Sequence, residues 1–340
     1  MLASVISETG DPNVITVEEV PDPDPAADEV LISVVACAVN HTDLWIRRGH
    51  EGDPPIITGI DIAGEIAAVG DDVEDSSVGD RVVVYWNTTS CGDCEFCNHG
   101  ETTMCLDYGG LGVKTDGGHA EYLAVESRHV VELPDAVPFE EAAAVPSNFG
   151  TAWRGLVTRA EVGPSDTVLV LGASGGVGHG AVQIAAHAGA TVYAASSSEE
   201  KAEKLRELGA DRVIDYTETD IDDAVADLTD RRGVDVVFES VGGETYEQGV
   251  RSLARGGRLV TIGATTGDAD QGMLQHVFWK QLEIIGATGA TMGEFEDMLE
   301  VFFDGDVRPV IDRVIDLEDI PEAHERLSAG EGFGKIIVRP

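Results

Sequence analysis

The chain is poor in positive charge. Its 340 residues include 22 Lys and Arg but 63 Asp and Glu, which gives a formal net charge of −41. We expect no nucleic-acid partner, because no basic stripe is present to neutralise phosphates. The acidic residues are spread along the chain and do not form one tail. The carboxylates of such a protein repel one another at low salt and destabilise its compact state. At 1 M salt the Debye length falls to about 3 Å, which screens most of this repulsion. The composition therefore predicts a halophilic protein.

Long apolar runs are missing as well. No segment approaches the roughly 18 consecutive apolar residues of a membrane span. The first residues also lack the basic stretch followed by an apolar run that marks a secretory leader. We therefore expect a cytoplasmic protein with no membrane partner.

Cysteine is rare, and four of the five cysteines lie between residues 91 and 105. Their spacing suits a tetrahedral zinc site with no open position, which makes the metal structural. Disulfides are disfavoured in the cytoplasm. An iron–sulfur run has about three residues before its fourth cysteine and a proline after it, and neither feature is present. We predict one structural Zn²⁺ per chain, in a lobe at 88–108. Its ligands are Cys91, Cys94, Cys97 and Cys105.

Two patterns divide the chain. Short apolar runs separated by Gly and Asp, such as 28–40, 64–70 and 80–86, are typical of a small β-barrel. After residue 139, strands and helices alternate. This alternation predicts a parallel, doubly wound sheet, and hence an α/β protein. The last strand, within 332–340, has no parallel partner nearby in sequence, so we expect it to return to the first domain.

A glycine turn within Val168–Ala190 joins an apolar strand to a helix and predicts a dinucleotide site. Glycines let a diphosphate approach the backbone, and the helix N-terminus supplies N–H donors and the positive end of a dipole. The alternative is a turn that serves only to pack the helix on the sheet. The predicted contacts are Ala173, Ser174, Gly175, Gly176, Val177 and Gly178.

The next strand ends in hydroxyls where an acidic residue would select NAD. Ser196, Ser197 and Lys201 suit the 2′-phosphate of NADP(H), which a carboxylate would repel. Glu199 and Glu200 lie close by, and the serines have an alternative role as caps of the following helix. The pattern favours NADP(H).

Several motifs together resemble the zinc-type medium-chain dehydrogenase/reductase superfamily. They are "GDRV" at 79–82, the cysteine lobe, "DGGHAEY" at 116–122, "ASGGVG" at 173–178 and the closing "GKIIV". The resemblance implies a GroES-like β-barrel catalytic domain at 1–145 and 288–340, and a Rossmann domain at 146–287. It also implies a homodimer, with a tetramer as the alternative, and the dimer would be built partly through an edge strand at 282–288.

Alcohol dehydrogenases of this superfamily hold a second, catalytic zinc. Carried over position by position, its three ligands fall on Asn40, Ile60 and Ser147, and none of these is a strong zinc ligand. Cys37 lies too early in the chain and is expected to pack in the core. A relocated metal site remains open as an alternative. Its ligands would be Cys37, His41, Asp43 and Asp61.

The resemblance also suggests roles for single residues. Asn40 would orient the substrate or the nicotinamide ribose, and His41 would pass protons. Asp43 is a third catalytic candidate, for which bonding to the backbone is the alternative. Further cofactor contacts are expected from Thr151, Tyr216, Gly263, Ala264 and Lys335, the last as a phosphate-binding base.

These expectations lead to a hypothesis about function. Without a Lewis-acid metal, alcohols are poor hydride donors, whereas an alkene conjugated to a carbonyl accepts hydride at its β-carbon. The sequence predicts an NADPH-dependent reductase of a small molecule, namely a quinone, an enone or an enoyl thioester. One alternative is a zinc-dependent alcohol or aldehyde dehydrogenase with a displaced metal. The other is a non-enzymatic nucleotide-binding protein.

Overall fold

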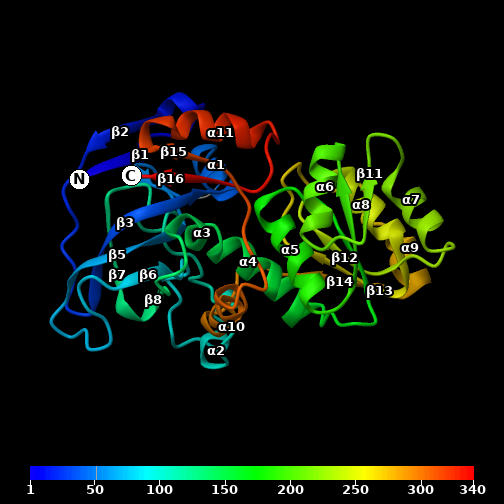
Figure 1. Cartoon of the computed structure of the whole chain (residues 1–340), viewed down its shortest axis with the longest axis horizontal. Coiled ribbons are helices and arrows are strands. Elements are labelled where there is room, and N and C mark those ends of the chain that lie inside the picture. The colour runs from blue at the N-terminus through cyan, green and yellow to red at the C-terminus, as the bar shows by residue number, and fades with distance from the viewer. Residues whose placement is uncertain (51) are drawn as a thin grey trace. The chain divides into compact units, whose positions relative to one another are not determined.

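The computed structural model describes residues 1–50 and 52–340, and they form two compact units (Figure 1). The first unit comprises Met1–Ser147, Thr291–Phe303 and Pro309–Pro340, and the second comprises Asn148–Ala290 and Asp304–Arg308. The predicted divisions after residues 145 and 287 lie a few residues from these bounds.

Two sheets build the first unit. The larger has the order β15-β16-β3-β5-β6-β8, with β7 also pairing β3, and the smaller has the order β2-β1-β4. The strands of the larger sheet are β3 (Glu29–Val39), β5 (Asp61–Val69), β6 (Arg81–Val84), β7 (Tyr122–Glu126), β8 (Val130–Glu132), β15 (Ile311–Asp316) and β16 (Lys335–Arg339). Those of the smaller sheet are β1 (Leu2–Ile6), β2 (Ile15–Glu19) and β4 (Ile56–Ile57).

The core of this unit follows the alternation of its strands. Along β3, alternate residues from Val30 to Ala36 are buried, and the remaining residues to Val39 are all buried. Cys37 joins the same apolar cluster as Ile62 on β5. β16 pairs antiparallel with β3, so the last strand does return to the first domain, as predicted. The expectation that it has no parallel partner nearby in sequence is wrong, because it pairs parallel with β15. The helices of the unit are α1 (His41–Arg47), α2 (Glu95–Asn98), α3 (Phe139–Ala143), α10 (Met292–Phe303) and α11 (Ile320–Ser328).

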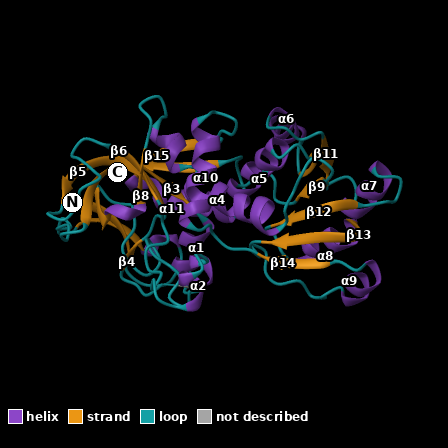
Figure 2. Ribbon diagram, turned by 90° about the horizontal axis from the view of Figure 1, so that it is seen from below, coloured by secondary structure: helices purple, strands orange, loops and turns teal. Residues whose placement is uncertain are grey.

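The second unit is a parallel sheet with crossover helices, and Figure 2 shows β12, β13 and β14 as neighbouring arrows. Its strands are β9 (Thr167–Val170), β10 (Thr191–Ser196), β11 (Arg212–Asp215), β12 (Val234–Glu239), β13 (Leu253–Thr261) and β14 (Glu283–Gly286). Its helices are α5 (Gly176–His187), α6 (Glu199–Glu207), α7 (Ile221–Leu228), α8 (Gly243–Ser252) and α9 (Leu274–Lys280). The sheet order β11-β10-β9-β12-β13-β14 is the Rossmann order 3-2-1-4-5-6. The predicted doubly wound sheet is confirmed.

The two patterns of the sequence meet at α4 (Pro146–Trp153), which starts in the first unit and continues into the second. Pro146 separates α3 from α4, because proline has no N–H for a preceding turn but fits the first position of a helix. No helix among the described residues is long and apolar enough to cross a membrane.

Candidate active site and cofactor site

The turn between β9 and α5 has the geometry of a dinucleotide-binding turn. Gly172 has a φ of +66°, which favours glycine. A Cβ at Gly178 would lie 2.1 Å from the carbonyl oxygen of Gly172, so this position has no room for a side chain. A Cβ at Gly175 would meet that same oxygen only at 3.4 Å, so a ligand has room beside this backbone. α5 begins at the next residue without a side-chain cap, and its N-terminus can therefore receive an anion.

The other predicted cofactor residues of this unit follow the carboxyl ends of its strands, with one exception. Parallel strands end at one edge of a sheet, which is where ligands of such folds bind. Ser196 is the last residue of β10, and Ser197 and Lys201 follow that strand. Tyr216 follows β11, and Gly263 and Ala264 follow β13. The exception is Thr151, which lies on α4. The Tyr216 side chain is half exposed, and its backbone N–H donates to the carbonyl of Ser196 (3.1 Å).

The end of β10 carries hydroxyls whose neighbouring acids are already paired. Ser198 caps α6 by accepting a hydrogen bond from the backbone N–H of Lys201 (3.3 Å). The helix-capping alternative therefore holds for Ser198, whereas Ser196 donates its hydroxyl proton to the carbonyl of Ser198 (3.1 Å). The two acids that opposed a 2′-phosphate in the sequence each contact a base. Glu199 pairs with Arg206 at 2.6 Å, and Glu200 with Lys204 at 3.1 Å.

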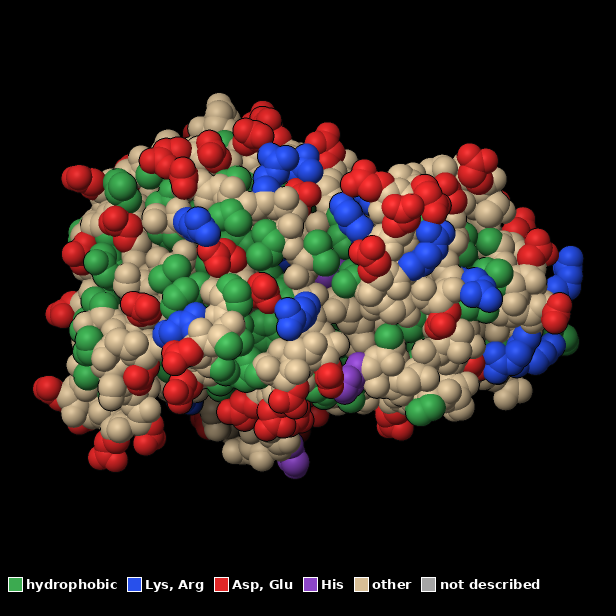
Figure 3. All heavy atoms as spheres, in the orientation of Figure 1, with side chains coloured by type: hydrophobic (Ala, Val, Ile, Leu, Met, Phe, Trp, Pro, Cys, Tyr) green, Lys and Arg blue, Asp and Glu red, His purple; other side chains and the backbone are tan. Residues whose placement is uncertain are grey.

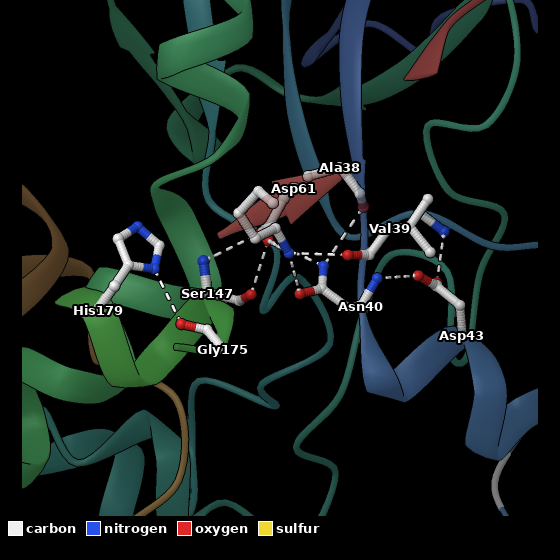
Figure 4. A network of polar contacts seen from close by, with 10 residues as sticks. Ala38, Val39, Asn40, Asp43, Asp61, Ser147, Gly175 and His179 are labelled. Carbon is white, nitrogen blue, oxygen red and sulfur yellow. Dashed lines mark hydrogen bonds and ion pairs between the residues drawn. The ribbon is translucent and has the colours of Figure 1, made fainter. Parts of the chain in front are cut away.

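In the first unit, a buried polar cluster lies where β3, β5, α4 and β16 meet (Figure 4). Asp61 is fully buried at the start of β5. Its Oδ2 accepts hydrogen bonds from Asn40 Nδ2 (2.9 Å) and from Ser147 Oγ (2.8 Å). Its Oδ1 accepts the backbone N–H of Ser147 (2.7 Å). Asp61 therefore joins Asn40 and Ser147, two of the three positions to which the resemblance assigns catalytic zinc ligands. We call Asn40, Asp61, Ser147 and Lys335 the polar cluster.

Lys335 completes the polar cluster and is not placed as a phosphate-binding base. Its side chain is only 3% exposed. Its Nζ donates to Asn40 Oδ1 (2.6 Å) and to the carbonyl of Val39 (2.8 Å), and it lies 3.7 Å from Asp61 Oδ2. The lysine thus directs its charge into the first unit, and this placement corrects the role that the resemblance implied.

The Asp43 carboxylate accepts hydrogen bonds from two backbone N–H groups. Its Oδ2 accepts the N–H of Asn40 (2.6 Å), which caps α1, and its Oδ1 accepts the N–H of Gly59 (3.1 Å). The side chain is fully buried, and burial raises its pKa to about 6 against the opposing effect of these donors. Both oxygens are engaged, so the structure favours the backbone alternative over a catalytic role for Asp43.

His41 opens α1 and is half-buried. Burial lowers its pKa to about 4, and the charges of Lys335 and Arg48 add to this effect. The imidazole is therefore neutral at pH 7, which weakens the predicted role in passing protons.

The four cysteines of the lobe come together as predicted. All four Sγ atoms lie within 4.8 Å of one another. Backbone N–H groups of Cys91 and Asp107 point at the sulfur of Cys105 (both 3.4 Å), and that of Cys97 points at Cys94 (3.5 Å). Such donors stabilise thiolates, so the quartet fits a structural zinc. Within 1–50 and 52–340 it is the only group of three or more such side chains placed to hold a metal. The relocated set of Cys37, His41, Asp43 and Asp61 is therefore not assembled there.

Comparisons with known proteins agree with both units. Residues 26–135 match the family "Alcohol dehydrogenase GroES-like domain", and residues 176–304 match "Zinc-binding dehydrogenase". An acryloyl-coenzyme A reductase of Sulfurisphaera tokodaii is 34% identical over 327 residues, covering 95% of this chain and 96% of that protein. The chain belongs to the zinc-type medium-chain dehydrogenase/reductase superfamily.

Two solved structures of this superfamily show the range of chemistry among the relatives. An NAD-dependent alcohol dehydrogenase superposes with a TM-score of 0.97 at 37% identity, with both chains fully covered. A crotonyl-CoA carboxylase/reductase superposes with a TM-score of 0.90 at 30% identity, covering 100% of this chain and 88% of that one. The protein is thus an oxidoreductase by family, and its relatives include both alcohol dehydrogenases and enoyl-thioester reductases.

The three positions to which the resemblance assigns ligands do not fit the second zinc of the superfamily's alcohol dehydrogenases. Ile60 has no donor atom, and Asn40 and Ser147 offer only an amide and a hydroxyl. Both are hydrogen-bonded to Asp61. Sequence reasoning named Asn40 and Ser147 as altered positions but missed that Asp61 bonds to both and that Lys335 bonds to Asn40. The signal was available, since a lysine in "GKIIV" is one of only five in the chain.

Proposed function

We propose that this protein is an NADPH-dependent reductase of activated alkenes, with a 2-enoyl thioester as its substrate class. The polar cluster is the observation that carries the proposal. The resemblance places the ligands of a Lewis-acid metal at Asn40, Ile60 and Ser147, which offer an amide, no donor and a hydroxyl, and the amide and the hydroxyl are bonded to Asp61. An alcohol bound there would therefore lack the electrophile that its oxidation requires. A carbon made electron-poor by a conjugated thioester accepts hydride without that help.

Among the possible acceptors, thioesters are favoured by the relatives. The acryloyl-coenzyme A reductase and the crotonyl-CoA carboxylase/reductase both bear names of enzymes that act on enoyl thioesters. The quinones and enones of the sequence hypothesis stay within the same chemistry. In an enone or an enoyl thioester, hydride adds to the β-carbon, negative charge develops on the conjugated oxygen, and a proton from solvent is then added at the α-carbon. In a quinone, the hydride electron pair places negative charge on the oxygens, and these are protonated from solvent to give the hydroquinone.

The residues of the second unit would bind the cofactor. NADPH supplies the hydride when bound. The open backbone at Gly175 and the N-terminus of α5 would receive its diphosphate. Ser196, Ser197 and Lys201 would receive the 2′-phosphate, and the pairing of Glu199 and Glu200 with bases reduces the repulsion that it meets.

The test compares two reactions and counts metal. With acryloyl- or crotonyl-coenzyme A we expect oxidation of NADPH followed at 340 nm, a standard assay wavelength, and with primary or secondary alcohols and NADP⁺ we expect none above background. Elemental analysis should give one zinc per chain. Alcohol oxidation together with two zinc ions per chain would establish the alternative, an alcohol dehydrogenase with a displaced metal. Tight NADPH binding with no turnover of any acceptor would establish a non-enzymatic role.

A further inference from the structure

Lys335 is a buried lysine with three acceptors close to its Nζ. Its Nζ contacts the amide oxygen of Asn40 (2.6 Å) and the carbonyl of Val39 (2.8 Å), and it lies 3.7 Å from the Asp61 carboxylate. The exposed fractions of Lys335 and Asp61 are 3% and 0%. A buried ammonium is tolerated only when it is paired and hydrogen-bonded, and both conditions are met here.

The ammonium fixes how the polar cluster is oriented. Because it donates to the oxygen of the Asn40 amide, the nitrogen of that amide is turned toward Asp61, to which it donates (2.9 Å). The same Asp61 oxygen accepts the hydroxyl of Ser147 (2.8 Å). One positive charge therefore orders a chain of contacts that runs from Lys335 through Asn40 and Asp61 to Ser147. Ser147 is the least buried member of the polar cluster.

We propose that the Lys335 ammonium supplies to the polar cluster the positive charge that a catalytic zinc supplies at the corresponding positions of alcohol dehydrogenases. It acts as a positioning residue, through Asn40, Asp61 and Ser147. Its role in turnover rests on the proposed function. Charge–charge interactions in a water-poor site are far stronger than in water, so a fixed cation near the reacting region favours the negative charge that develops during hydride addition.

The competing view is that Lys335 only neutralises Asp61 and so keeps the fold. Two variants separate these roles. Lys335→Met keeps the length of the side chain, loses the charge and leaves Asp61 buried and unpaired. The double variant Lys335→Met/Asp61→Asn removes both charges, and an asparagine retains an oxygen that can accept from Ser147. If Lys335→Met fails to fold, the double variant carries the test.

We expect Lys335→Met to lower both Tm and kcat, with kcat falling roughly a hundredfold, as when one preorganised electrostatic contact is lost. The KM for NADPH should stay within about threefold, because the cofactor residues lie in the other unit. The double variant should recover most of the Tm but not the kcat, and this split is what the proposal requires. A purely structural lysine would give a double variant in which Tm and kcat recover together, and that result would overturn the proposal.

A matched control is Lys280→Met. Lys280 also donates to two carbonyls, those of Arg251 and Leu253 (2.8 and 2.7 Å), but in the second unit. The Lys280→Met variant should have a lower Tm than the parent and the same kcat. The acceptor in all assays is whichever one the parent enzyme reduces. Absence of turnover in the parent would therefore contradict the proposed function, whereas an unchanged kcat in Lys335→Met would contradict this inference.

Discussion

At the scale of single residues, we expect the choice between NADPH and NADH to depend on the end of β10. Ser196 occupies the position where an acid would bind the ribose hydroxyls of NAD and repel a 2′-phosphate. We expect Ser196→Asp to lower the ratio of kcat/KM for NADPH to that for NADH by roughly a hundredfold, about 2.7 kcal/mol. Lys201→Ala should weaken the binding of NADPH and leave the binding of NADH unchanged.

Steady-state kinetics with both cofactors measure this ratio. The matched control is Ser7→Asp, which adds the same charge at an exposed position of the first unit. A Ser196→Asp variant that keeps its preference for NADPH would show that β10 does not select the cofactor.

Buried histidines should make the fold sensitive to acid. Burial lowers the pKa of His324 and of His119 to about 3. Between pH 3 and the unfolded value of about 6.5, the unfolded chain therefore binds more protons than the folded one. The contribution of these two histidines to the free energy of unfolding is fully present above about pH 6.5, and it is lost as the pH drops through this window. His324 alone accounts for on the order of 5 kcal/mol over the whole window.

We expect His324→Gln to flatten this dependence, because glutamine can still accept the hydrogen bond that Arg47 Nε donates to His324 Nδ1 (3.3 Å) but does not titrate. Urea unfolding between about pH 7 and pH 4.5 measures the slope. His50→Gln, at an exposed position, is the control and should keep the slope of the parent. If the free energy of unfolding had the same slope against pH in His324→Gln and in the parent, His324 would not contribute to the acid sensitivity.

At the scale of elements, the cysteine lobe depends on its metal. α2 has no buried residue, so apolar packing gives this helix little stability. Cys97→Ser should lower the zinc content from about one per chain to near zero and make 88–108 a site of rapid proteolysis. Cys37→Ala changes the one cysteine outside the lobe and should leave the zinc content unchanged. Full zinc content in Cys97→Ser would mean that the quartet is not the ligand set.

The sequence predicted elements well where one local rule decides the structure. The alternation in 167–261 predicted the parallel sheet, and the cysteine spacing predicted the quartet. The polar cluster escaped prediction because its members lie at 40, 61, 147 and 335 and meet only through sheet pairing of β3 with β5 and β16. The resemblance assigned three altered ligand positions to Asn40, Ile60 and Ser147, which stays a prediction, and it misplaced Lys335. Only side-chain geometry shows that this ammonium points at Asn40 instead of outward.

The second unit has an exposed strand, β14, at the edge of its sheet. β14 ends the parallel sheet, with Ile284 41% exposed, and neighbouring α9 exposes Phe278 and Trp279 by about two thirds. We propose a homodimer through this edge. Ile284→Lys should raise the dimer Kd tenfold or more, about 1.4 kcal/mol, as measured by analytical ultracentrifugation. Val314→Lys, equally exposed on the edge strand β15, is the control. A parent that sediments as a monomer would contradict the proposal.

At the scale of the whole molecule, the charge of −41 sets the conditions under which the fold is stable. At most 22 of the 63 acidic side chains can pair one-to-one with Lys or Arg, and Figure 3 shows carboxylates scattered over the visible surface of the protein. The ion pairs that do form at the surface contribute little each. Mutual repulsion among the remaining carboxylates therefore opposes folding, and it weakens as salt shortens the Debye length.

We expect the Tm to rise by roughly 10 °C or more between about 0.1 M and 2 M KCl, with most of the rise complete once the Debye length falls below the spacing of neighbouring carboxylates. Differential scanning calorimetry at pH 7.5 or so, above the window in which the buried histidines titrate, measures this shift without their contribution. Sucrose at matched water activity is the control, because it favours compact states by exclusion but screens no charge. If sucrose raised the Tm as much as KCl does, repulsion would not be the limiting term. A Tm that stays constant across the KCl series would show that the acidic surface carries no stability cost, and the halophilic interpretation of the composition would then be wrong.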